Sequence, residues 1–61
     1  MSTQRYAHVI IDIADTQPII VQVVTSHWLA IRVRADRIVD YNRNPDDVRI
    51  YKMPIISTLD T

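Results

Sequence analysis

The first apolar segment of the chain alternates in the way that is typical of a β-strand. Within residues Tyr6–Ile13 (YAHVIIDI), one face is built from β-branched residues and the opposite face is mixed. The first face carries Val9, Ile11 and Ile13, and the second carries His8, Ile10 and Asp12. This period predicts a largely buried strand with the Val9 face in the core.

A second strand is expected after a short loop. Residues 14–18 (ADTQP) are polar and end in a proline, which favours an irregular connection. The strand then runs from Ile19 to about Thr25, and its segment IIVQVV is apolar on both faces except at Gln22. Such a pattern indicates cover on both sides. In a chain this short, we expect the second cover to come from another subunit.

Residues 26–41 fit two patterns. As strands, the apolar positions 29, 31, 33 and 35 alternate with positions 30, 32, 34 and 36, followed by a tight turn and a short strand Ile38–Tyr41. As a helix over residues 27–41, the segment is capped by Ser26. One side of that helix would carry Trp28, Ile31, Ala35, Ile38 and Val39. Propensity favours the strands, because four residues are β-branched and Glu and Lys are absent from the segment.

The rest of the chain combines a clear loop with further strand pattern. Residues 42–47 (NRNPDD) predict a loop, with Asn before Pro and two Asp after it. Val48–Met53 (VRIYKM) alternates as a strand and is interrupted by Pro54. A last short apolar element is expected from Ile55, Ile56 and Leu59.

Composition supports a β-rich fold in one small domain over residues 1–61. Ile and Val together make up 17 of the 61 residues, and β-branched side chains suit a pleated surface. Glycine is absent, so positions of positive φ must be filled by Asn or Asp. The segment VRIYKMPIISTLD resembles the strand, one-turn crossover and closing strand that finish SH3-like and Sm-like barrels. We therefore expect an all-β, five-stranded SH3-like or Sm-like barrel. The alternative is an α+β fold with a three-stranded antiparallel sheet and one helix at about residues 27–41.

Several functional classes are not expected from this composition. The chain has no cysteine for a thiolate site and no glycine for a phosphate-binding loop. His8 and His27 do not have the spacing of a ligand pair, so we expect no metal and no cofactor. No nucleophile and base are placed together, so an enzyme is not expected. Seven basic residues balance seven acidic residues, and no segment is long and apolar enough to span a membrane. The segment MSTQR does not resemble a secretory signal, which favours a cytoplasmic location.

Arginine is the residue type that rises above this background. Six of the seven basic residues are arginines, and four of them lie within twelve positions near aromatic residues. Planar guanidinium groups bind carboxylate or phosphate bidentately, and aromatic residues dominate many interfaces. The residues predicted to bind a partner are Trp28, Arg32, Arg34, Arg37, Tyr41, Arg43 and Tyr51. The charge balance of the segment favours a different interpretation, because residues 28–43 carry a net charge of only +2, four Arg less two Asp. In that interpretation Asp36 and Asp40 pair with these arginines and leave a neutral, solvated face.

Surplus apolar surface is the second feature. A small barrel has fewer inward positions than the chain has large apolar residues, so part of that surface needs cover. We therefore expect a homo-oligomer that acts as a non-enzymatic binding protein on a larger macromolecule. Chains of this size with no catalytic residues are often phage- or plasmid-type regulators or inhibitors of a host protein. The alternative function is an oligomeric barrel that binds RNA or single-stranded nucleic acid.

Overall fold

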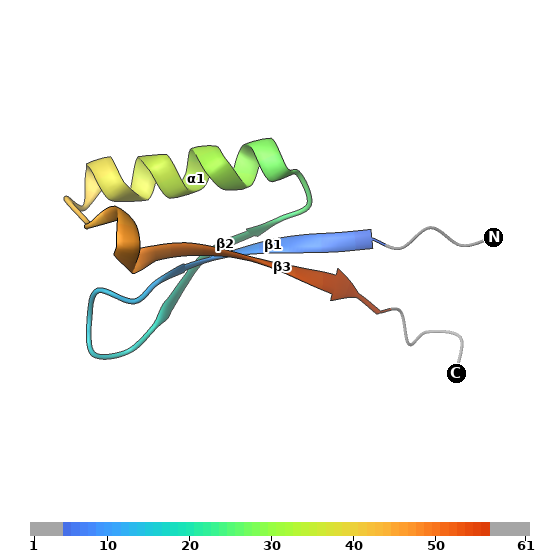
Figure 1. The fold of residues 1–61 in the computed structure, drawn as a ribbon, viewed down its shortest axis with the longest axis horizontal. Helices are drawn as coiled ribbons and strands as arrows, with labels where there is room; N and C mark the ends of the chain where they lie inside the picture. Colours follow the sequence, from blue (N-terminus) through green and yellow to red (C-terminus); the bar gives the residue numbers. More distant parts are fainter. Residues whose placement is uncertain (1–4, 57–61) are drawn as a thin grey trace.

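The computed structural model describes residues 5–56, which form one antiparallel sheet with a helix on one side (Figure 1). The strands are β1 (Arg5–Asp12), β2 (Ile19–Val24) and β3 (Val48–Ile55), and the order in the sheet is β2-β1-β3. Helix α1 (His27–Asp40) connects β2 to β3, together with a single 3₁₀ turn, η1 (Pro45–Asp47). The central strand β1 pairs antiparallel with both neighbours.

The expected five-stranded barrel is wrong, and the α+β alternative describes the fold. Residues 29–41, expected as two strands, form most of α1 and its C-cap. The sheet is open, because β2 and β3 each pair only with β1 within residues 5–56. Pro54 does not interrupt the last strand but lies within β3, on a sheet edge where proline is tolerated. Ile55 ends β3, and Leu59 of the expected last element lies outside the described residues.

Local signals at both ends explain why residues 27–40 are helical despite their β-branched content. The Ser26 hydroxyl accepts a hydrogen bond from the backbone N–H of Leu29 at 3.4 Å, as an N-cap does. After the helix, Asn42 has a φ of 51°. This confirms that an asparagine fills the left-handed position in a chain without glycine. Packing of Val33 and Ile38 against the sheet outweighs the strand propensity of the segment.

On both α1 and β1, the face that lies in the interior is not the one expected from the sequence. On α1, Ala30 is fully buried and Val33 is partly buried against the core. The side expected to pack points outward instead, except for Ile38; the exposed residues are Trp28, Ile31, Ala35 and Val39. On β1, the buried residues are His8, Ile10 and Asp12, whereas Val9 and Ile11 are half-buried on the far face.

The buried apolar core is small. Among residues 5–56, three apolar side chains are buried, namely Ile10, Ala30 and Val48, one each from β1, α1 and β3. The register places Ile10 beside Ile50 and Asp12 beside Val48, so these residues share the face under α1. One extra residue in β2, Val21, produces an irregularity opposite Ile10 and Ile11. Two polar residues, His8 and Asp12, complete the covered face.

Candidate functional site

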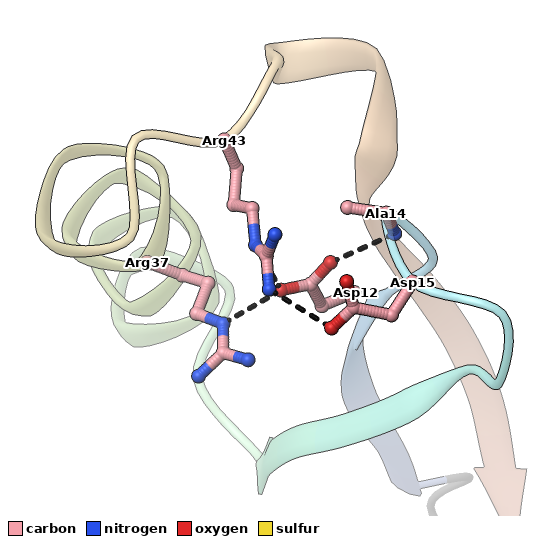
Figure 2. Close-up of polar contacts among 5 residues, drawn as sticks. All are labelled: Asp12, Ala14, Asp15, Arg37 and Arg43. Atoms are coloured by element: carbon pink, nitrogen blue, oxygen red, sulfur yellow. Dashed lines mark hydrogen bonds and ion pairs between the residues drawn. The ribbon is translucent and has the colours of Figure 1, made fainter.

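A buried carboxylate holds the helix against the end of the sheet. Asp12, at the end of β1, is 1% exposed. Its Oδ2 accepts hydrogen bonds from Nε of Arg37 at 2.8 Å and from Nε of Arg43 at 3.0 Å (Figure 2). Its Oδ1 accepts from the backbone N–H of Ala14 at 3.0 Å. We call Asp12, Arg37 and Arg43 the carboxylate cluster.

The contacts of this cluster favour its charged state. The hydrogen bond from the backbone N–H of Ala14, followed by those from Arg37 and Arg43, holds the pKa of Asp12 below its ordinary value despite desolvation. In turn, the hydrogen bond with Asp12 raises the pKa of Arg37. Nη2 of Arg43 also reaches Asp15 at 3.2 Å. These contacts join β1 to the last turn of α1 and to the following loop, so the cluster stabilises the fold.

Two other predicted partner-binding residues are also occupied by contacts within the chain. Tyr41 lies over the guanidinium of Arg37, with 3.7 Å between Cζ and the ring centroid. Arg34 donates from Nε to the Val48 carbonyl at 2.7 Å and from Nη2 to the Pro45 carbonyl at 2.7 Å. Arg34 therefore fastens α1 to η1 and to the start of β3.

The seven predicted partner-binding residues are divided among three places. Arg34 and Arg37 lie in the C-terminal half of α1, and Tyr41 and Arg43 follow the helix before η1. Trp28 and Arg32 are exposed on the outer side of α1, and Trp28 is 80% exposed. Tyr51 lies on β3 beside Val9, on the sheet face away from the helix. The carboxylates that pair with the arginines are Asp12 and Asp15, rather than the expected Asp36 and Asp40.

The sheet face opposite α1 is apolar and uncovered within the chain. In the register, Val23, Val9 and Tyr51 form one cross-strand row, and Ile20 and Ile11 belong to the next row. The exposed apolar members of this face define the sheet surface: Ile20, Val23, Tyr51, Met53 and Ile55. The exposed Arg49 lies on the same face, at one end of β3. Ile20 is 64% exposed. A continuous surface of this kind is typical of an interaction site.

The outer side of the helix carries a second apolar surface. Trp28, Ile31, Ala35 and Val39 recur at intervals of three and four residues, which places them on one side of α1. We call these four residues the helix stripe. Val39 is 77% exposed, so both ends of the helix stripe are open to solvent.

A hollow that no sequence pattern indicated lies at the other end of the helix. This open hollow of about 550 Å³ is lined by Tyr6, His8, Thr25, His27 and Lys52. The His8 and His27 rings lie with 5.4 Å between their centroids. Within residues 5–56, no group of three or more His, Cys, Asp or Glu side chains is placed to hold a metal ion.

Comparison with known proteins gives no relative: the chain matches no protein-family model, no curated protein and no solved structure. In the part of the chain that the structure describes, no helix is both long and apolar enough to cross a membrane. The candidate functional features are therefore the carboxylate cluster, the sheet surface, the helix stripe and the hollow.

Proposed function

We propose that this protein is a non-enzymatic binding module that self-associates through the sheet surface and binds a larger partner protein through the helix stripe. The observation that carries the proposal is the uncovered apolar face of the sheet. Ile20, Val23, Tyr51 and Met53 are at least 40% exposed there, although the covered face of the same sheet buries a histidine and an aspartate. A second copy supplies the missing cover for these side chains.

Packing of two sheet surfaces face to face is the association that suits this geometry. Sheets pack about 10 Å apart with interdigitating side chains, and a twofold arrangement would use the same surface on both copies. Burial of the exposed part of each of the five side chains contributes about 1 kcal/mol, or about 10 kcal/mol for two copies, before the cost of association. We therefore expect a dimer that forms at micromolar or higher concentration.

The helix stripe provides a separate surface for a partner. An exposed helix with apolar residues at intervals of three and four is the form in which helices bind apolar grooves of other proteins. Tryptophan is among the residues that contribute most to such interfaces, and Trp28 is more exposed than any other large apolar residue of the structure's described part. A cytoplasmic location, expected from the sequence, belongs to the same proposal.

The nucleic-acid alternative gains no support from the arginine contacts. Arg37 and Arg43 donate to carboxylates, and Arg34 donates to two backbone carbonyls. The described donors of these three arginines are therefore engaged within the chain. Among the four arginines of the predicted group, Arg32, on the outer side of α1, is the exposed one.

A matched pair of substitutions tests the self-association. Val23→Lys places a charge in the sheet surface, and Val39→Lys makes the same change in the helix stripe; both valines are exposed. Sedimentation velocity between about 10 µM and 1 mM is expected to show a dimer for the wild type and for Val39→Lys. Val23→Lys is expected to remain a monomer, with an unchanged circular dichroism spectrum. A wild-type monomer over the whole range would contradict the proposal, as would a dimer that survives Val23→Lys and dissociates with Val39→Lys.

A further inference from the structure

The hollow beside the N-terminal end of α1 collects basic groups from three elements. His8 comes from β1, His27 is the first residue of α1, and Lys52 comes from β3. His8 and Lys52 are cross-strand neighbours in the register. Figure 1 shows β1 and β3 extending past the N-terminal end of α1.

Negative charge does not balance this group. The five residues that line the hollow are Tyr6, His8, Thr25, His27 and Lys52, none of which is acidic. Nζ of Lys52 lies 4.3 Å from the ring centroid of Tyr6, an aromatic contact rather than an ion pair. The N-terminus of a helix carries partial positive charge. The first turn of α1, which begins at His27, contains no acidic residue.

His8 adds an independent observation. Its side chain lines the hollow, yet the residue is only 8% exposed. Its Nδ1 has no hydrogen-bond partner among residues 5–56. Buried polar atoms are nearly always paired, so an unpaired one needs an explanation. The imidazole of His8 therefore lies beside His27 and Lys52 with a buried nitrogen that has no partner, and no carboxylate lines the hollow.

We propose that this hollow binds a small oxyanion of the phosphate type, as inorganic phosphate or as the phosphoryl group of a small monoester. A phosphate oxygen accepts hydrogen bonds from ammonium and imidazolium groups, which are stronger than bonds between neutral partners. Lys52 and His27 are exposed and supply the direct contacts. The ring of His8 lies beside them with its Nδ1 unpaired. Tyr6 and Thr25 add hydroxyl groups.

The site is separate from the surfaces that carry the proposed function. Its β1 residues, Tyr6 and His8, alternate with Val9 and therefore lie on the helix side of the sheet. The sheet surface lies on the opposite side. Failure of self-association would not affect anion binding, and failure of anion binding would leave self-association unchanged.

Titration with inorganic phosphate, followed by NMR of the full chain at constant ionic strength, tests the proposal. Resonances of His8, His27 and Lys52 are expected to shift together, because all three residues line the hollow. Lys52→Gln and His27→Gln are each expected to weaken binding about tenfold, the loss of one charge-assisted hydrogen bond. Arg49→Gln is the control, because it removes an exposed cation from the far face of the same strand.

The outcomes separate clearly. Binding that is weakened by Lys52→Gln and His27→Gln but not by Arg49→Gln supports the site. Equal weakening by all three variants would show unspecific attraction and would overturn the proposal. Absence of shifts up to the highest soluble phosphate concentration would overturn it as well. A parallel titration with Zn²⁺ alone that shifts His8 and His27, while phosphate shifts neither, would replace the anion site by a metal site.

Discussion

The layer between α1 and the sheet is more polar, and the two outer surfaces are more apolar, than is usual in a folded monomer. The covered layer buries Asp12 and His8 beside the three buried apolar residues. The outer surfaces expose the larger apolar groups, including Trp28 on the helix and Ile20 on the sheet. In a self-sufficient monomer, the more apolar faces of both elements would point inward.

The difference has a physical origin in the contacts of Asp12. Its carboxylate accepts from Arg37 and Arg43, and these bonds are available only if α1 lies on the Asp12 face of β1. Fixing the helix on that face leaves Val9 and Ile11 on the far side of the sheet. The polar contacts thus select the arrangement within one chain, and the apolar surface that remains is available for association.

Loss of the carboxylate cluster is expected to have the largest effect. Asp12→Ala leaves Arg37 and Arg43 without their buried partner, which is strongly destabilising. The thermal midpoint is expected to fall by more than about 10 °C in a circular dichroism melt. Asp15→Ala is the control, because the Asp15 side chain is 57% exposed; it should change the midpoint by less than about 3 °C. A similar fall of the midpoint in both variants would show that the buried carboxylate of Asp12 contributes no more stability than the exposed Asp15.

The next largest effect on stability is expected from truncating a valine in the buried layer, compared with truncating a valine in the helix stripe. Val48→Ala opens a space in the buried layer and is expected to cost about 2 kcal/mol in the free energy of unfolding. Val39→Ala makes the same change in the helix stripe and is expected to cost less than about 0.5 kcal/mol. Urea denaturation at low protein concentration measures both. Equal costs would show that the helix stripe is buried in the free protein.

Acid is expected to weaken the covered layer selectively. Because the pKa of Asp12 is lowered in the folded state, its charge contributes stability above the ordinary carboxyl pKa. That contribution is lost as the pH falls below about 4 and then through the folded-state pKa. The stability difference between wild type and Asp12→Asn should therefore be largest near neutral pH and shrink in acid. A difference that is constant between pH 7 and pH 3 would contradict this role for the charge.

The smallest expected effect is in the fluorescence of Trp28, the single tryptophan of the chain. Trp28 lies on the helix stripe, so dimerisation through the sheet surface should leave its emission maximum where a solvent-exposed indole emits. Dilution through the dimer–monomer transition should therefore cause no shift. A blue shift that accompanies dimer formation would place the helix, rather than the sheet, in the dimer interface.

The strand positions could be predicted from the sequence, but the covered faces could not. The expected segments Tyr6–Ile13 and Ile19 to about Thr25 lie within one residue of β1 and β2. Alternation defines two faces of a strand, yet it does not say which face a helix will cover. Whether the Val9 face or the Ile10 face of β1 is covered depends on the hydrogen bonds of Asp12 with two arginines. Arg37 lies 25 residues away from Asp12 in the sequence, and Arg43 lies 31 residues away.

The residue types of the candidate sites could be predicted from the sequence, but their partners in space could not. Arginine enrichment was visible, but its carboxylate partner was not, because Asp12 belongs to a strand that alternates like any other. His8 and His27 have no recognisable spacing in the sequence. The β1–β2 hairpin and the turn into α1 bring their rings together. The strand interpretation of residues 26–41 is wrong because the Ser26 cap and the packing of the helix against the sheet outweigh the strand propensity of the segment.

The most direct test of the central claim is an isotope-filtered NOE experiment on a mixture of ¹³C-labelled and unlabelled chains. Contacts between copies are observed separately from contacts within one copy. The account predicts intermolecular NOEs to the methyl groups of Val23 and Met53 on the sheet surface, and none to the methyl groups of Val39 on the helix stripe. Intermolecular NOEs confined to Val39 and Trp28, or a complete absence of them at millimolar concentration, would contradict it.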